Sequence, residues 1–587
     1  MDIQQILQKY DDPSRKDFEE YQLNSELHKN FTKVNGELPC DDLAELMAFG
    51  FNEDYQDIKT GWGTYFGPMT VIRNDNGTAT ETPSIRLVNN DILDYWHSRA
   101  KIANHPILVA RYSGLVWDFT KYVTQNQPPA EIAKICINAI IKVALENYYI
   151  NEINVFSKLK RALSIAILLN DKDLISKCKN AIITFENTVS KDLLPGIWGH
   201  AFDLLMFNKK AQLSEDEEKF IIDELEAKLE RLLSVDSQEL QKTIWPAQNS
   251  ATRLADYYRK RSQNQDVFRI ICKFADASEQ YVKGASVAEI AGNAQDLYKL
   301  YIKYHLKDKA AEMLLKVRSL GTKVPSEMKT VGADLNIPTE KIREYLSGMT
   351  KGGLADTIQR LLFTYIPIKE TEEGILRKKA AKAPISYLFT QQLIDSKGRL
   401  ITTIGPLEED FDAHLIKEIS NNLTLQSITL RFLIDEMISK FGFNSSDILE
   451  TIKDCPAIDQ HRLKIIEKGL DAYFENDFVV AIHLIIPQIE EAIRNIVEFG
   501  GGNVLKESRG GGFHLRTFDD LLRDNIINES LDADLVNYFK ILFTDQKGWN
   551  LRNNVCHGMT NLEEFNFQTA DRLIHALLCL SIIKYID

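Results

Sequence analysis

Apolar residues recur at every third or fourth position through most of residues 116–380, and this spacing predicts amphipathic helices. Two such runs flank Asn170-Asp171 and two more flank Lys307-Asp308, so each of these places indicates a pair of helices joined by a turn. The apolar positions are Leu163, Ala166, Ile167, Leu174, Ile175 and Cys178 in the first pair, and Leu297, Leu300, Tyr301, Tyr304, Ala310, Met313, Leu314 and Val317 in the second. No fixed period links the pairs, so we expect an irregular, solenoid-like α-helical repeat region, a fold that usually presents a surface to a partner.

The pattern changes around residues 386–404. The runs Ser386–Ile394 and Arg399–Ile404 flank Asp395-Ser-Lys-Gly398 and predict a small β-hairpin. Earlier in the chain, the stretch from Gly61 to Pro68 is rich in glycine and aromatic residues, and it indicates either a loop pinned to a core by its aromatic side chains or a ligand site.

These changes divide the chain into four predicted regions, and its 587 residues agree with about four domain-sized units. We expect a mixed, partly helical region at 1–115, the repeat-like region at 116–380, a connector with the hairpin and helices at 381–455, and a helical bundle at 456–587. The fold class is therefore expected to be mainly α.

Composition narrows the classes of protein. Apolar residues make up 44% and charged residues 26% of the chain, no apolar run is long enough to cross a membrane, and the first residues resemble no secretory signal. We therefore expect a cytoplasmic protein without a membrane partner. The net charge of −14 argues against broad binding of nucleic acid, so any contact with RNA must be local. Seven scattered cysteines without a Cys-x-x-Cys pair suggest neither a disulfide framework nor a zinc site.

The helix predicted from Asp477 to Phe499 carries Glu490 and Arg494 four residues apart on one face, which is ordinarily a surface ion pair. A glycine-rich loop follows and holds the basic residues Lys506, Arg509 and Arg516. Residues 499–518 carry three basic residues and one acidic residue, a local charge of +2 in an acidic protein. The loop is either a flexible connector or a contact for RNA.

The stretch Arg552-Asn553-Asn554-Val555-Cys556-His557-Gly558 has the most informative chemistry. Asn553 and His557 are four residues apart and share a helix face, and the long side chain of Arg552 reaches round to them. Cleavage of RNA without a metal needs a group that takes the proton of the 2′-hydroxyl and a cation that stabilises the phosphate. His557 and Arg552 supply these two functions, and Asn553 would bind the phosphate or orient His557.

The spacing alone is weak evidence, because Arg99 with His105 and Arg509 with His514 show a similar one. Only the Arg552 stretch adds an asparagine directly after the arginine, a glycine directly after the histidine, and a long apolar helix beyond. In the structural alternative, Asn553 and Asn554 cap a helix, His557 binds a backbone carbonyl, and Arg552 pairs with an acidic neighbour such as Asp545 or Asp571.

The form Arg552-Asn553-x-x-x-His557-Gly558 resembles the DUF4209 family and, more broadly, the HEPN superfamily of helical ribonucleases, over about residues 456–587. The resemblance implies a helical bundle that forms a homodimer, so that two Arg-His motifs face one cleft. It also implies cleavage of RNA without a metal or cofactor, leaving a 2′,3′-cyclic phosphate. Many relatives act in phage defence or as toxins, which implies a protein or phage-derived trigger. The helix around Glu490 and Arg494 resembles an earlier helix of the family, which implies that these two side chains approach the site.

Other catalytic classes lack their motifs. The sequence has no phosphate-binding Gly-x-x-x-x-Gly-Lys-Ser/Thr loop, His-Glu-x-x-His zinc motif, Gly-x-Ser-x-Gly elbow or Gly-x-Gly-x-x-Gly fingerprint. The leading hypothesis is therefore a metal-independent endoribonuclease, and the alternative is a non-catalytic helical interaction module.

Overall fold

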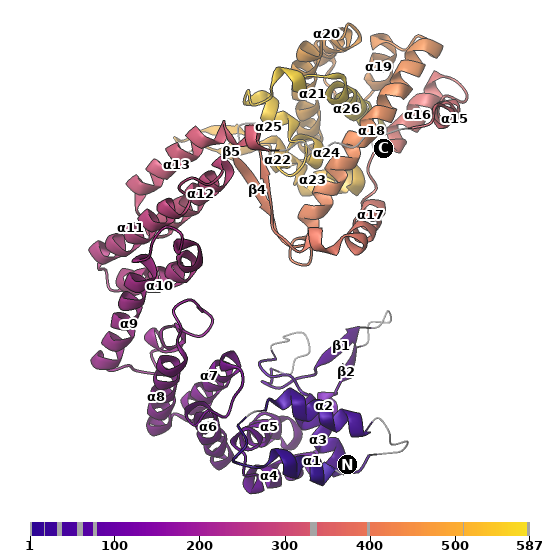
Figure 1. Cartoon of the computed structure of the whole chain (residues 1–587). Helices are drawn as coiled ribbons and strands as arrows, with labels where there is room; N and C mark the ends of the chain where they lie inside the picture. The colour runs from indigo at the N-terminus through magenta and orange to yellow at the C-terminus, as the bar shows by residue number, and fades with distance from the viewer. Residues whose placement is uncertain are drawn as a thin grey trace. The chain divides into compact units, whose positions relative to one another are not determined.

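A computed structural model describes residues 3–16, 18–31, 38–55, 63–73, 79–328, 337–395, 399–508 and 510–583. Contacts divide the chain into two compact units, Met1–Lys316 and Val317–Asp587. In the described ranges the protein is mainly α, with three two-stranded antiparallel sheets, so the predicted fold class is confirmed (Figure 1). The finer division into four regions stays a prediction.

The first unit contains most of the repeat-like helices. Its elements are α1 (Ile3–Tyr10), α2 (Glu20–Phe31), α3 (Cys40–Gly50), β1 (Thr70–Arg73), β2 (Ala79–Thr82), α4 (Asn90–Ile102), α5 (Pro106–Thr124), α6 (Ala130–Leu145), α7 (Glu152–Leu169), α8 (Lys172–Val189), α9 (Glu215–Leu233), α10 (Leu240–Lys260), α11 (Asn264–Tyr281), α12 (Val287–Lys303) and the first ten residues of α13 (Lys307–Gly321), a helix that crosses the boundary between the units.

One hydrophobic core joins α1 to α6, and the aromatic loop described from residue 63 onward is anchored in it. Phe66 is buried, and the guanidinium of Arg111 lies 4.7 Å from the centre of its ring. The anchoring of the loop by an aromatic side chain is therefore confirmed for Phe66, whereas Gly61 and Trp62 lie outside the described residues.

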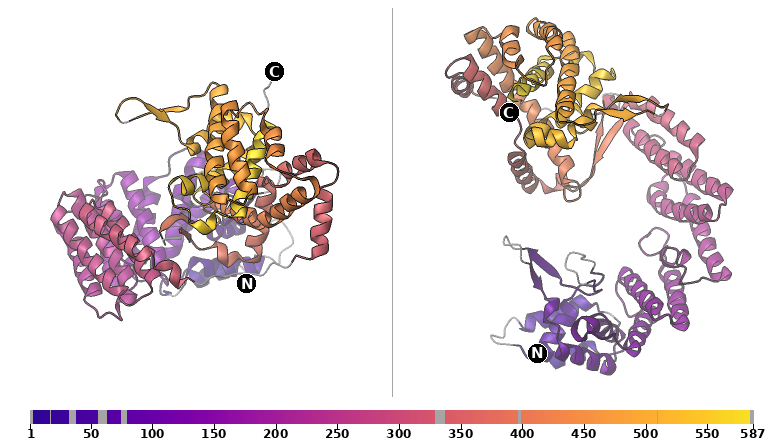
Figure 2. Two further views of the ribbon diagram at one scale, coloured as in Figure 1. Left: turned by 90° about the horizontal axis from the view of Figure 1, so that it is seen from above. Right: turned by 180° about the vertical axis from the view of Figure 1, so that it is seen from behind.

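Both predicted helix pairs are present. Between α7 and α8, Asn170 adopts a left-handed conformation with φ of 53°, and the side chain of Asp171 accepts the backbone N–H groups of Asp173 and Leu174. The second turn lies slightly earlier than expected, because His305, with φ of 60°, reverses the chain and Lys307 already belongs to α13. Consecutive helices from α5 to α8 and from α9 to α12 pack on one another (Figure 2).

The second unit contains the candidate motif. Its elements are α14 (Val324–Glu327), α15 (Thr339–Met349), α16 (Leu354–Thr364), α17 (Lys369–Lys382), β3 (Gln391–Ile394), β4 (Leu400–Ile404), α18 (Phe411–Phe441), α19 (Ser445–Ile452), α20 (Leu463–Phe474), α21 (Phe478–Phe499), β5 (Leu505–Glu507), β6 (Phe513–Leu515), α22 (Phe518–Leu522), α23 (Asn525–Ser530), α24 (Ala533–Phe543), α25 (Leu551–Cys556) and α26 (Phe567–Cys579).

A single hydrophobic core of this unit includes residues from Met349 to Leu580, so it crosses the predicted boundaries at 380 and 455. The long helices α18 and α21 both pack against α26, which is the central helix of this core. Arg572 on α26 is fully buried, and its guanidinium donates to the carbonyl oxygens of Tyr365 and Leu423 and to the hydroxyl of Ser427. Residues before 456 therefore complete the core on which the candidate motif rests.

The predicted hairpin of residues 386–404 is confirmed as β3 and β4, although residues 384–387 form a 3₁₀ turn instead of extending the first strand. The turn residues 396–398 lie outside the described part of the chain. The long apolar helix expected beyond Gly558 is α26. It ends at Cys579, and a 3₁₀ turn over Leu580–Ile582 follows.

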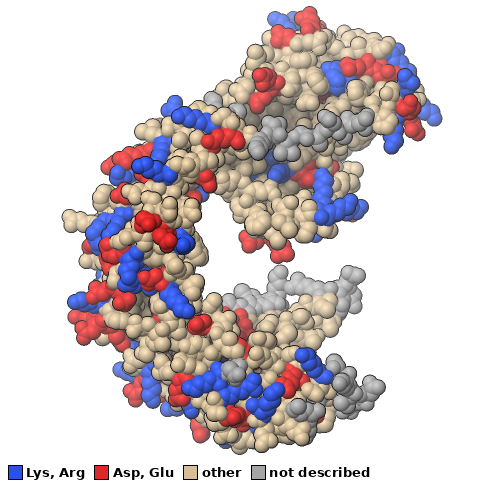
Figure 3. Space-filling model, viewed as in Figure 1, with Lys and Arg blue, Asp and Glu red and all other residues tan. Residues whose placement is uncertain are grey.

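On the face drawn in Figure 3, lysine and arginine side chains alternate with acidic ones. Such mixing fits the expectation that any contact with a polyanion is local. Among the described residues, no helix combines the length and apolar composition needed to span a membrane.

Candidate functional site

The motif occupies α25 and the turn that follows it. Leu551 and Val555 are buried in the core of the second unit and fix this short helix in place. Arg552 and Asn553 are partly exposed on the same helix, and His557 is exposed. The apolar positions of the helix therefore anchor it while its polar positions face outward.

α25 ends at Cys556, so His557 is the first residue after the helix, whereas the predicted shared helix face with Asn553 requires His557 to lie within it. Its backbone N–H still donates to the carbonyl oxygen of Asn553 at 3.0 Å, so the two residues stay on neighbouring turns of chain. Gly558 follows with φ of 63°, the left-handed conformation that ends helices and favours glycine. Within the described chain the imidazole makes no hydrogen bond or ion pair, which leaves both ring nitrogens open to a ligand.

Arg552 is held by Glu490 of α21. Its Nε lies 2.8 Å from Glu490 Oε2 and its Nη2 lies 3.3 Å from Oε1, while Nη1 donates to Asn553 Oδ1 at 3.3 Å. Burial by itself would lower the pKa of the guanidinium, but the hydrogen bonds and charge of Glu490 outweigh burial and raise it. The structure thus fixes the orientation and the positive charge of Arg552.

Glu490 also pairs with Arg494 at 3.2 Å, so the predicted ion pair is present. It is not a surface pair, however, because the Glu490 and Arg494 side chains are only 12% and 11% exposed. The reason is tertiary: α21 packs against α20, α25 and α26, which leaves little of its surface to solvent. Arg494 has a second acidic partner in Glu491, so Glu490 is shared between Arg494 and Arg552.

The partners suggested for Arg552 from sequence, Asp545 and Asp571, are both wrong. Asp545 accepts the backbone N–H of Lys547 at 2.8 Å. Asp571 is fully buried on α26, where it accepts the Tyr473 hydroxyl at 2.6 Å and lies 3.4 Å from Arg431. Burial raises the pKa of Asp571 to about 7.

The glycine-rich loop forms the hairpin of β5 and β6, whose residues are all exposed and extend away from the helices (Figure 2). Arg516 is committed to the base of this hairpin, since it pairs with Asp524 at 2.6 Å and donates to the carbonyl oxygens of Asn503 and Asp520. Lys506 is 60% exposed and lies 3.6 Å from a carboxylate oxygen of Asp520. Arg509 lies outside the described residues. Of the two described basic residues, Lys506 is the one that remains accessible to RNA.

Arg399 is a neighbour of the motif that the sequence did not indicate. It precedes β4, and its Nη2 lies 4.0 Å from the sulfur of Met559, two residues beyond His557. Its side chain is 47% exposed and is also held by Asp395. The separation of 160 residues in sequence explains why no local pattern could reveal this contact.

The similar spacing of Arg99 and His105 has a structural role. His105 is fully buried, caps the first turn of α5, and contacts the carbonyl oxygen of Arg15 through Nε2 at 2.8 Å. Arg99 pairs with the buried carboxylate of Glu45 at 3.4 Å. The Arg-His spacing alone therefore does not indicate a catalytic site, because the same spacing serves a structural role at Arg99 and His105.

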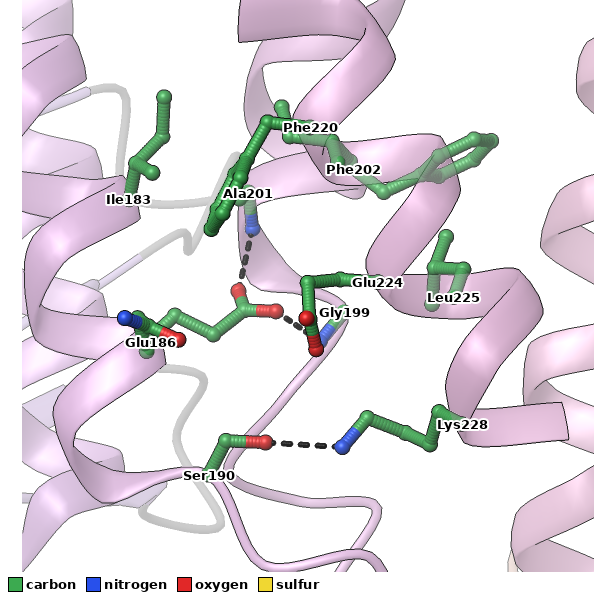
Figure 4. Close-up of a pocket in the computed structure, with 12 residues that line it drawn as sticks. Ile183, Glu186, Ser190, Gly199, Ala201, Phe202, Phe220, Glu224, Leu225 and Lys228 are labelled. Atoms are coloured by element: carbon green, nitrogen blue, oxygen red, sulfur yellow. Dashed lines mark hydrogen bonds between the residues drawn. The ribbon is translucent and has the colours of Figure 1, made fainter. Parts of the chain in front are cut away.

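A second candidate lies between α8 and α9 in the first unit, where Figure 4 shows polar groups around a small cavity. The carboxylate of Glu186 accepts the backbone N–H groups of Gly199 and Ala201 at 2.7 and 2.6 Å, and Lys228 donates to Ser190 at 3.0 Å. The space enclosed is about 40 Å³, enough for about one water molecule. These groups fasten the loop after α8, and they do not form a ligand site.

A comparison of this chain with protein-family models, curated proteins and solved structures finds no match. The resemblance of residues 456–587 to the HEPN superfamily and the DUF4209 family stays a prediction.

Proposed function

We propose that this protein is a metal-independent endoribonuclease whose reaction is carried by Arg552, Asn553 and His557. The observation that carries the proposal is the exposed imidazole of His557, which has no hydrogen-bond partner among the described residues, five positions after an arginine whose orientation is fixed by Glu490. General acid–base catalysis and stabilisation of charge on the phosphate are the two requirements of this chemistry, and both groups are present.

Arg552 keeps capacity to bind a phosphate despite its ion pair. A guanidinium has five N–H groups. Glu490 accepts two of them and Asn553 accepts one, so two remain for the oxygens of a substrate. Asn553 donates its own amide N–H to Asn550 at 2.7 Å, and it therefore acts mainly by orienting Arg552.

In the proposed reaction, His557 takes the proton from the 2′-hydroxyl of the RNA. The 2′-oxygen then forms a bond to phosphorus, the bond between phosphorus and the 5′-oxygen breaks, and the departing 5′-oxygen takes a proton from a second acid. A general acid–base pair needs two groups, and each chain supplies one histidine at its motif. We therefore propose a homodimer through the second unit, in which the partner's motif supplies the acid.

The decisive test is incubation of the full chain with total cellular RNA in the presence of EDTA, comparing wild type, His557→Ala and His461→Ala. His461 is an exposed histidine of the same unit outside the motif, so its variant is the matched control. We expect cleavage by wild type and His461→Ala that leaves 2′,3′-cyclic phosphate ends, and none by His557→Ala. Equal cleavage by His557→Ala would overturn the assignment.

The second candidate function, a non-catalytic helical interaction module, is favoured by the pairing of Arg552 with Glu490 and by its side-chain exposure of only 23%. In that case the ion pair is part of the scaffold. Wild type that leaves RNA intact, with and without extracts of phage-infected cells as a source of trigger, would favour this module.

A further inference from the structure

A cavity of about 430 Å³ lies against α25, where Leu551, Asn554 and Val555 line it. Two aromatic residues, Trp549 and Phe565, also line the cavity. One face of Phe565 is already stacked on His483, with ring centres 5.1 Å apart. The volume of the cavity is in the range of small-molecule pockets, and aromatic side chains such as these favour flat, uncharged ring systems.

The polar groups of the cavity have unused hydrogen-bonding capacity. The hydroxyl of Thr560 is buried without a hydrogen-bond partner among the described residues. Asn554 donates to the carbonyl oxygen of Trp549 at 3.2 Å, which leaves its side-chain oxygen free to accept. One carboxylate oxygen of Glu564 accepts the backbone N–H of Asn561 at 2.8 Å, and the other oxygen accepts no hydrogen bond among the described residues. Buried polar groups are almost always paired, so the Thr560 hydroxyl points to a ligand that supplies its missing partner. The partly exposed Asn554 and the exposed Glu564 offer further acceptors beside it.

These groups are mainly acceptors. The side-chain oxygen of Asn554 and the free oxygen of Glu564 can only accept, while the hydroxyl of Thr560 can do either. A ligand that donates from the edge of a flat ring can therefore pair with all three of these groups. Guanine, adenine and cytosine carry exocyclic amino groups with two N–H donors, whereas uracil donates from its Watson–Crick edge only through its ring N3–H.

The cavity lies close to the catalytic residues because they share one short helix. Asn554 and Val555 line it, and they lie between Asn553 and His557 in the sequence. An α-helix with its side chains is about 10–12 Å across, so groups on neighbouring faces of α25 are within roughly 10 Å of one another. That distance is comparable to the span of one nucleotide from its phosphate to the far edge of its base.

We propose that this cavity, the base pocket, binds an amino-bearing nucleobase of the nucleotide next to the cleaved bond. The proposal rests on the ribonuclease function, because it assigns the specificity of the same site. Phe565 and Trp549 stack on the base, Glu564 and Asn554 accept from its exocyclic amine, and Thr560 binds a neighbouring ring atom. The protein thereby selects its cleavage position by base identity despite an overall negative charge.

The first test uses DNA oligonucleotides with a single ribonucleotide, so that only one bond can be cut. The base on either side of that bond is guanine, hypoxanthine, cytosine or uracil. Hypoxanthine differs from guanine only by the missing 2-amino group. On one side of the bond we expect cleavage at guanine to exceed cleavage at hypoxanthine by about tenfold or more, the discrimination typical of a lost contact to a base edge.

The variants Glu564→Ala and Asn554→Ala remove the acceptors assigned to the exocyclic amine and should reduce this ratio to within about threefold. Phe565→Leu removes stacking and should lower cleavage at guanine and at hypoxanthine alike. Phe363→Leu replaces a phenylalanine that is 59% exposed on α16 and serves as the matched control, so it should keep the wild-type ratio. Equal cleavage of all four bases on both sides by the wild type would overturn the base pocket and leave the ribonuclease function standing.

A second measurement does not depend on cleavage. Binding of guanosine 5′-monophosphate and inosine 5′-monophosphate to full-length His557→Ala is compared by titration calorimetry. Tighter binding of the guanosine nucleotide, with the difference lost in Glu564→Ala, supports the base pocket even if wild type cuts no RNA and the ribonuclease function fails. Equal binding of the two nucleotides, or no binding, overturns the base pocket.

Discussion

Replacing Glu490 with glutamine removes one negative charge from between two arginines while keeping the size of the side chain. The carboxylate lies 2.8 Å from Nε of Arg552 and 3.2 Å from Nη2 of Arg494, and it is 12% exposed. In the variant, the two guanidinium groups face one another across a neutral amide. Arg494 keeps Glu491, but Arg552 loses the only carboxylate that holds it among the described residues.

The size of the effect follows from burial. Removing one partner of a buried ion pair destabilises a protein by about 3–5 kcal/mol, whereas an exposed pair contributes about 0–1 kcal/mol. Arg552 is 23% exposed and Arg494 retains a second partner, so we expect local destabilisation of about 2–3 kcal/mol, between these limits. Since 1.36 kcal/mol corresponds to a factor of ten, backbone amides of α21 and α25 should exchange roughly 30- to 150-fold faster.

Hydrogen–deuterium exchange of the full chain, read by mass spectrometry on peptides from α21 and α25, measures this change directly. Glu491→Gln is the matched control, because Glu491 is the adjacent glutamate, pairs with the same Arg494, and is 30% exposed. Its effect should be at most about 1 kcal/mol, or roughly fivefold in exchange. Equal loss of protection in the two variants would refute the argument that burial of Glu490 makes its ion pairs strong.

Three further perturbations probe other parts of the structure. The pKa of Asp571 is raised to about 7 in the folded chain, against 3.8 when unperturbed, so the folded state binds a proton that the unfolded state has already released and loses stability as pH rises from about 4 to 7. Asp571→Asn should abolish this loss and raise the free energy of unfolding above pH 7 by up to about 4 kcal/mol, as measured by urea titrations. Gly548→Ala should lower the melting temperature, because an added Cβ would lie 2.2 Å from the carbonyl oxygen of Ile541. Gly292→Ala, where the Cβ meets open space on α12, should instead raise the free energy of unfolding by about 0.5–1 kcal/mol. Scanning calorimetry that shows both variants shifting the melting temperature in the same direction would contradict this reasoning. Arg572→Met should destabilise the second unit by about 3 kcal/mol or more, since it leaves buried carbonyl oxygens unpaired, while Arg523→Ala at a 59% exposed position should cost less than about 1 kcal/mol in the same urea titrations.

Local signals in the sequence were sufficient for the two helix pairs and for the helix that contains Glu490. The turn between α7 and α8 was identified because Asn170 and Asp171 interrupt an apolar period, and the structure uses them as a left-handed end and a helix cap. The helix containing Glu490 was placed to within one residue at its start. Such features depend on contacts within a few residues, so the sequence contains the information directly.

The charged loop shows where sequence reasoning overestimated the site. Its charge of +2 counted Lys506, Arg509 and Arg516 without the aspartates beyond residue 518. In the structure, Asp524 and Asp520 fold back on Arg516 and Lys506, so the local field is weaker than the sequence count suggests. A count over a window cannot include charges that approach through a turn.

By itself, the sequence determined the helical fold class, the positions of the helix pairs and the candidate residues Arg552, Asn553 and His557, because these depend on neighbours along the chain. Only the tertiary structure decided which charges meet: Arg552 finds Glu490 across 62 residues, and Arg399 reaches Met559 across 160. It also decided that Arg494 is buried and His557 exposed. The physical reason is that burial and ion pairing depend on which helix faces pack together, and a one-dimensional pattern records the face of a helix but not its partner.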